Sequence, residues 1–100
     1  MSTRPQKLSD DDRADALAKL GGWAYDAEAL AINKTFKFAD FSEAWAFMNR
    51  AALLAEKMDH HPEWFNVYNR VEVKMTTHDA DGVTALDIEM ATAMNRFAGE

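Results

Sequence analysis

Three histidines are the residues of this sequence best suited to proton-transfer chemistry. His60 and His61 are adjacent, His78 follows them, and the 100 residues contain no other histidine. Histidine exchanges a proton close to neutral pH, so it can act as a general acid or base. Glu56 and Asp59 lie just before the pair and could orient the imidazole rings. The cluster therefore predicts an acid/base site.

Two other interpretations of these histidines stay open at this point. A His-His pair before Pro62 can simply be the polar end of a helix, and periodicity alone favours that interpretation. Three imidazoles could also bind a zinc ion. Neighbouring helical positions point about 100° apart, so His60 and His61 would meet at one ion only if the helix unwound there. The zinc site is therefore disfavoured, and we expect no bound metal.

The composition excludes several other classes of protein. The sequence has no glycine loop for phosphate, no dinucleotide fingerprint and no G-x-S-x-G elbow. It has no cysteine, which excludes a disulfide scaffold and favours an intracellular, cytoplasmic protein. A formal net charge of -6 argues against direct nucleic-acid binding, which depends on Lys and Arg. We also expect no membrane partner, because no apolar run approaches the about 20 residues of a membrane span.

The length and hydrophobic content predict one domain. A chain of 100 residues, of which 48% are hydrophobic, is long enough for a single buried core. We expect residues 1–7 to form a flexible tail and residues 8–100 to form the domain. Ser9 followed by three aspartates is typical of a helix start, which predicts a helix over residues 10–20. Residues 23–26 and 31–38 then have the pattern of two paired strands.

The longest periodic segment predicts a second helix, which starts at Asp40 and runs to Met58. Its apolar residues recur at spacings of three and four, and they are Phe41, Ala44, Trp45, Met48, Ala51, Ala52 and Ala55. Phe47 and Leu54 lie outside this row and widen the apolar face. The wider face could pack on the core or contact a partner subunit.

The second half of the sequence repeats the order of two strands and a helix. Residues 64–67 and 71–77 are the predicted strands, with a bend at Asn69 and Arg70. Thr84 and Asp87 are spaced as a helix cap. The buried row of that last helix is expected to contain Val83, Leu86, Met90, Met94 and Phe97. The whole order predicts an α+β fold: a four-stranded antiparallel sheet with three helices packed on one face.

The segment from Glu56 to Tyr68, with His78 and Asp87, resembles the pterin-4a-carbinolamine dehydratases. This family includes the dimerisation cofactor of a homeodomain transcription factor in animals. The shared pattern is an acid, three residues, His-His-Pro, an aromatic residue, a distant histidine and then an aspartate. The similarity covers nearly the whole chain, and the family fold agrees with the predicted element order. Leu86 departs from some members, which have a basic residue there.

The resemblance implies a lyase that dehydrates a 4a-hydroxytetrahydropterin to the quinonoid dihydropterin. This reaction recycles the cofactor of an aromatic amino acid hydroxylase, and it needs no metal or redox cofactor. His60 and His61 are implied as general acids at the leaving hydroxyl, while His78 positions the pterin or accepts the N5 proton. The residues implied to bind the pterin substrate are Glu56, Asp59, Pro62, Trp64 and Asp87.

Other roles remain open for some of these residues and for the protein. Glu56 and Asp59 could only solvate the helix end, Trp64 could belong to the core, and Asp87 could only cap its helix. The resemblance also implies a homodimer or homotetramer. The alternative function is a helix-mediated interaction or coactivator module without a catalytic role.

Overall fold

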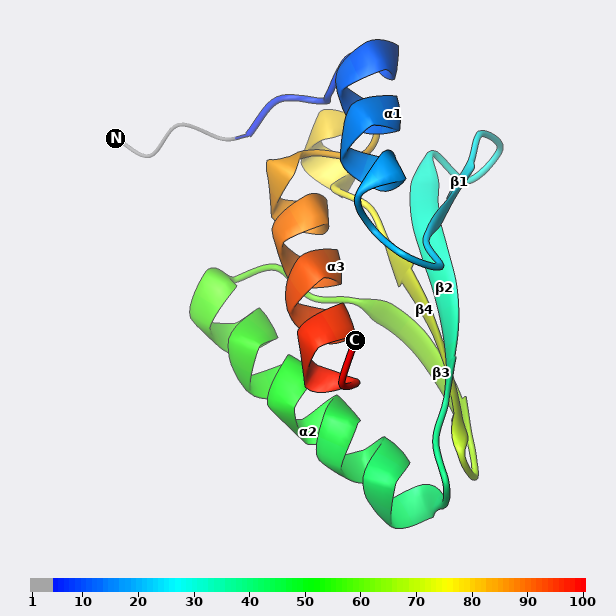
Figure 1. Ribbon diagram of the computed structural model, residues 1–100. Coiled ribbons are helices and arrows are strands. Elements are labelled where there is room, and N and C mark those ends of the chain that lie inside the picture. Colours follow the sequence, from blue (N-terminus) through cyan, green and yellow to red (C-terminus); the bar gives the residue numbers. More distant parts are fainter. Residues whose placement is uncertain (1–4) are drawn as a thin grey trace.

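The computed structural model describes residues 5–100, so residues 1–4 of the predicted tail lie outside the described residues. Figure 1 shows the three helices on one side of a four-stranded antiparallel sheet, and the predicted fold class is confirmed. The elements are α1 (Asp10–Ala18), β1 (Ala24–Asp26), β2 (Ala31–Lys37), α2 (Phe41–Met58), β3 (Glu63–Val67), β4 (Arg70–Met75), the 3-10 turn η1 (His78–Ala80) and α3 (Ala85–Phe97).

The sheet has the order β1-β2-β4-β3, so the two hairpins meet along β2 and β4. Ile32 lies opposite Met75 and Phe36 lies opposite Val71 at this junction, and all four side chains are buried under the helices. The alternate residues of the same strands point to the open face of the sheet. The two central strands therefore provide the floor of the core.

The turn between β3 and β4 lies one residue earlier than predicted. Val67 pairs with Arg70, so the two turn residues are Tyr68 and Asn69 rather than Asn69 and Arg70. Arg70 also pairs with Lys37 of β2, which keeps it within the sheet. Tyr68 takes a positive φ of 50° to reverse the chain. Pairing on both sides of β4 thus decides the position of the turn.

The first helix begins as predicted but ends before residue 20. The Ser9 side chain accepts a hydrogen bond from the Asp12 amide at 3.1 Å, which confirms the N-cap. The α-helix ends at Ala18, and the Leu20 amide bonds the Leu17 carbonyl in a tighter turn. This turn places Leu20 in the core, where it is 6% exposed.

The buried face of α2 differs from the predicted row. Phe47, which we expected outside the row, is 2% exposed and contacts Phe36 and Phe38, with ring centroids 4.6 Å and 5.1 Å away. Phe41 and Trp45, which we expected inside it, are 48% and 56% exposed. Apolar residues surround much of this helix, so its periodicity allows more than one buried face. The aromatic residues of β2 select the face that carries Phe47.

The buried row of α3 also needs correction, because Phe97 is only partly buried and Leu86 does not reach the core. Leu86 is only half-buried, whereas its neighbour Asp87 has an exposed fraction of 0%. Val83, Met90 and Met94 are buried as predicted. A carboxylate takes the core position because it finds polar partners there. Among the described residues, none of the helices combines the length and apolar character needed to cross a bilayer.

Candidate active site

The three histidines come together in one pocket, although they belong to two separate segments. The segment after α2 provides His60 and His61, and η1 provides His78. The pocket has a volume of about 260 Å³ and is lined by Asp59, His60, His61, Thr76, Thr77, His78 and Asp79. The sequence-based grouping of the three imidazoles is therefore reproduced in space. Thr76 and Thr77 are lining residues that the sequence analysis did not select.

The end of α2 explains how His60 reaches the interior. Asp59 takes a left-handed conformation (φ 51°, ψ 44°), which Asp tolerates better than most residues. The His60 amide then bonds the Ala55 carbonyl at 3.0 Å, and the Asp59 amide bonds the Glu56 carbonyl at 3.3 Å. This pair of bonds is the Schellman motif. It ends the helix and turns the chain toward β3.

His60 forms the buried imidazole-carboxylate pair of the site. Its Nε2 lies 2.6 Å from Asp87 Oδ1, and the two side chains are 10% and 0% exposed. Asp87 Oδ2 accepts hydrogen bonds from the Thr84 amide and the Thr77 hydroxyl, each at 2.8 Å. A carboxylate only accepts, so His60 donates through Nε2. Asp87 both caps α3 and orients His60.

His61 and His78 form exposed pairs instead. His61 Nε2 lies 2.6 Å from Glu56 Oε1, with side chains 55% and 79% exposed. His78 Nε2 lies 3.1 Å from Glu63 Oε2, and the His78 side chain is 82% exposed. Each histidine of the pocket thus has its own carboxylate. Glu63 was missed by the sequence analysis, although its position directly after His-His-Pro was a signal for it.

The five residues predicted to bind substrate occupy different places. Asp59 lines the pocket, Glu56 stands beside His61, and Asp87 lies behind His60. Pro62 and Trp64 are not among the lining residues; Trp64 is half-buried and packs on the hydrophobic core. Their assignment as substrate-binding residues stays a prediction.

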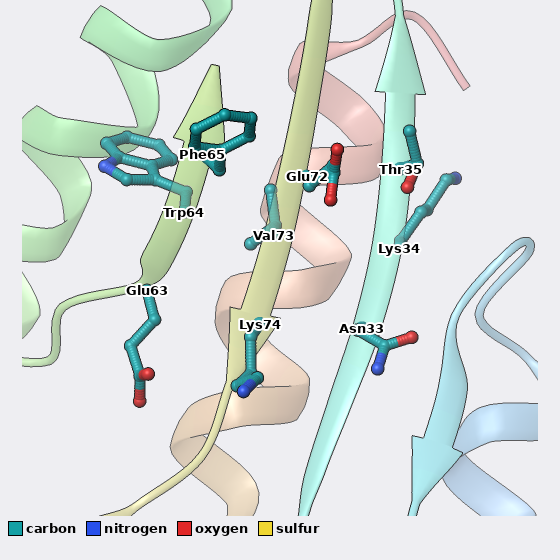
Figure 2. A pocket seen from close by; sticks show the side chains of 9 residues that line it. All are labelled: Asn33, Lys34, Thr35, Glu63, Trp64, Phe65, Glu72, Val73 and Lys74. Atoms are coloured by element: carbon teal, nitrogen blue, oxygen red, sulfur yellow. The ribbon is translucent and has the colours of Figure 1, made fainter. Parts of the chain in front are cut away.

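Two further hollows continue from this pocket. The first, also about 260 Å³, shares Thr76 and His78 with it and extends to Glu63 and Lys74. The second, about 400 Å³, includes those last two residues and opens on the helix-free face of the sheet. Figure 2 shows its polar side chains projecting from β2, β3 and β4. This larger hollow contains no imidazole, so the smaller histidine pocket is the candidate active site.

The placement of the possible metal ligands can be compared with the zinc site considered from the sequence. Within residues 5–100, no three His, Cys, Asp or Glu side chains are placed to share one metal ion. The imidazoles are instead each paired with a carboxylate, in the three pairs described above.

Comparisons with known proteins identify the family of this chain. A family model described as "Pterin 4 alpha carbinolamine dehydratase" matches residues 6–97. The chain is 64% identical over 91 residues to the "Putative pterin-4-alpha-carbinolamine dehydratase" of Novosphingobium aromaticivorans, covering 91% of this chain and 95% of that protein. It is 57% identical to the protein of the same name from Rhodopseudomonas palustris, covering 95% and 94%.

Solved structures of similar fold include a pterin dehydratase and a pterin dehydratase-like protein. The crystal structure of a "transcriptional coactivator/pterin dehydratase" from Brucella melitensis superposes with a TM-score of 0.92 at 53% identity, covering 94% of this chain and 100% of that one. A pterin dehydratase-like protein identified as a RuBisCO assembly factor shares the fold, with a TM-score of 0.69 at 19% identity over 79% of this chain and 92% of that one. With its matched sequence, fold and clustered histidines, this chain belongs to the pterin-4a-carbinolamine dehydratase family.

Proposed function

We propose that this protein dehydrates a 4a-hydroxytetrahydropterin to the quinonoid dihydropterin and so recycles the cofactor of an aromatic amino acid hydroxylase. The observation that carries the proposal is the convergence of His60, His61 and His78 on one pocket. Family membership supports the same substrate class. A pterin ring offers hydrogen-bond donors that suit the carboxylates around the pocket.

The proposed reaction moves two protons and breaks the C4a–O bond. A protonated imidazole gives its proton to the C4a hydroxyl, the C4a–O bond breaks, and water leaves. The nitrogen lone pair of N5 forms the new C4a=N5 bond, and the N5 proton passes to a second imidazole. We assign His60 and His61 as the general acids, and His78 as the group that positions the pterin or accepts the N5 proton.

The other predicted residues take supporting roles in the proposal. Asp59 lines the pocket and is placed to accept hydrogen bonds from the pterin, while Glu56 and Asp87 orient imidazoles. Pro62 and Trp64 stay proposed as substrate-binding residues, with Trp64 as a wall beside the pterin ring. The dehydration changes no net oxidation state, so it requires no redox cofactor, and the proposed proton transfers use no metal. Activity that survives dialysis against a chelator would agree with this part of the proposal, whereas a chelator-sensitive activity would contradict it.

A coupled assay tests the function directly. Purified protein added to a turning-over aromatic amino acid hydroxylase should speed the decay of the 4a-hydroxypterin absorbance. The double variant His60→Ala/His61→Ala should abolish this acceleration. Lys57→Ala is the matched control, since Lys57 is exposed at the same helix end but pairs with no histidine. A double variant as fast as the control would overturn the proposal.

The expected homodimer or homotetramer is part of the proposal. Phe41 and Trp45 stack on the exposed side of α2 with ring centroids 6.3 Å apart, and Leu53 on the same helix is 67% exposed. Exposed large apolar side chains grouped on one helix are typical of a contact surface. Sedimentation of the wild type and of Trp45→Glu tests it: a smaller species in the variant is expected, and a monomeric wild type would contradict it.

The cellular setting stays a prediction. We place the protein in the cytoplasm, with a hydroxylase as its functional partner and without direct nucleic-acid or membrane contacts. The net charge of -6 supports the absence of nucleic-acid binding. Fractionation of host cells, with activity measured in each fraction, tests the compartment. Activity confined to the membrane fraction would contradict this placement.

A further inference from the structure

Thr77 stands between the two segments that carry the histidines. It follows β4 and directly precedes His78, and it is 8% exposed. Its hydroxyl oxygen lies 2.8 Å from Asp87 Oδ2 and 2.8 Å from Thr84 Oγ1. Neither threonine belongs to the His-His-Pro pattern that identifies the family resemblance. Because the buried Thr77 hydroxyl makes two hydrogen bonds, we consider a role for it beyond packing.

The direction of these hydrogen bonds follows from the donors available. The Thr77 hydroxyl has one proton, and the carboxylate of Asp87 can only accept, so Thr77 donates to Asp87. Thr84 must then donate its hydroxyl proton to Thr77, while Thr84 Oγ1 accepts from the Leu86 amide at 3.2 Å. All polar atoms of the group are satisfied in one arrangement only.

This arrangement restrains the Asp87 carboxylate on the side away from His60. Oδ2 is held by the Thr77 hydroxyl and the Thr84 amide, and Oδ1 is thereby directed at His60 Nε2. Rotation of the carboxylate would break both bonds in a site that water does not reach, because Asp87 is 0% exposed. The Thr77 hydroxyl thus helps to keep the His60 proton on Nε2.

The backbone of Thr77 restrains the other segment. The Thr77 amide bonds the Gly82 carbonyl at 2.9 Å, and the Gly82 amide bonds back to the Thr77 carbonyl at 3.4 Å. The same carbonyl accepts from the Ala80 amide at 3.0 Å. These bonds close the short loop that contains η1 and therefore His78. One residue is connected to both histidine segments.

We propose that Thr77 is a positioning residue for this enzyme: its hydroxyl sets the orientation and tautomer of His60 through Asp87, while its backbone closes the loop that presents His78. The proposal rests on the proposed dehydratase function. Thr77 acts through these neighbours rather than on the substrate, so its hydroxyl affects the chemical step more than substrate binding.

The test compares Thr77→Val, which removes the hydroxyl but keeps the branched shape, with Thr77→Ser, which keeps the hydroxyl. Thr77→Val should lower kcat about tenfold with KM nearly unchanged, and Thr77→Ser should restore most of the loss. Thr92→Val is the matched control, because the exposed Thr92 hydroxyl bonds the Ile88 carbonyl within α3, away from the histidine pocket. Thr77→Val kinetics equal to those of Thr92→Val would overturn the proposal.

A second measurement needs no activity, and its wild-type part needs no variant. Nitrogen-15 NMR of the wild-type protein should show His60 with its proton on Nε2, and Thr77→Val should lose that single signature. A wild-type His60 with its proton on Nδ1 would also overturn the proposal. If the wild type lacks dehydratase activity, the proposed function fails, and the NMR spectra still decide whether the hydroxyl controls His60.

Discussion

Two imidazole-carboxylate pairs at the same helix end have the same length but very different surroundings. His60 with Asp87 and His61 with Glu56 are each separated by 2.6 Å. The first pair is nearly enclosed, with side chains 10% and 0% exposed, whereas the second is 55% and 79% exposed. Adjacent residues that line one pocket therefore differ in exposure: His60 is largely buried and His61 is exposed.

The comparison shows that distance alone does not measure what a pair contributes. An exposed pair replaces contacts with water by a contact within the protein, which stabilises the fold by only about 0–1 kcal/mol. Removing one partner of a buried pair leaves its desolvated group uncompensated and costs about 3–5 kcal/mol. We infer that the His60 pair fixes one rigid group in the pocket, while His61 remains free to adjust to a substrate.

The largest effect is expected from Asp87→Ala. The change leaves the His60 ring, the Thr77 hydroxyl and the Thr84 amide without their acceptor, all inside the protein. We expect the free energy of unfolding to fall by about 3 kcal/mol, as measured by urea denaturation. Asp87→Asn, which keeps the volume and one oxygen acceptor, should lose less. If the free energy of unfolding fell no more than for a surface substitution, the buried pair would contribute no more to stability than the exposed pair.

The next largest effect separates the two adjacent histidines. His60→Gln and His61→Gln should each reduce kcat by about 100-fold, the range expected when a general acid or base is lost. Only His60→Gln should also lower stability, by about 2 kcal/mol, because it disturbs a buried hydrogen bond to Asp87. Thermal unfolding measures the change in stability, and the coupled assay measures the change in kcat. Equal losses of stability in both variants would contradict the comparison.

A smaller effect is expected from Glu56→Gln. Glu56 is 79% exposed on its side chain, so the loss of its charge should change stability by less than about 0.5 kcal/mol. Activity should fall by less than about tenfold, because His61 loses only an orienting partner. Urea denaturation in parallel with Asp87→Ala is the measurement. A destabilisation that approached the Asp87→Ala value would mean that exposure does not separate these pairs.

The smallest effect is expected from Glu63→Gln. Its partner His78 is 82% exposed, and their contact of 3.1 Å is the longest of the three. We expect a stability change of about 0.2 kcal/mol or less, with the kinetic effect mainly on KM if His78 positions the pterin. A kcat loss as large as that of His61→Gln would instead assign Glu63 a direct part in proton transfer.

Local signals in the sequence predicted much of the fold. Ser9, Asp40 and Thr84 cap their helices as expected, because capping depends on residues only a few positions apart. The alternating pattern of β4 likewise predicted which of its side chains are buried. The burial of Phe47 could not be predicted, since it depends on contacts with Phe36 and Phe38 of a different element. The 3-10 turn at His78 was not predicted either.

The sequence by itself determined the element order, the family resemblance and the set of three histidines. The tertiary structure decided how those histidines differ, because burial and hydrogen-bond partners depend on residues distant in sequence. Asp87 lies 27 positions from His60, yet their side chains meet at 2.6 Å. Thr77 completes that group because the chain after β4 lies beside the start of α3, where its hydroxyl bonds Thr84 and Asp87. The sequence determined which groups can exchange protons, and the packing decided which of them is held rigidly.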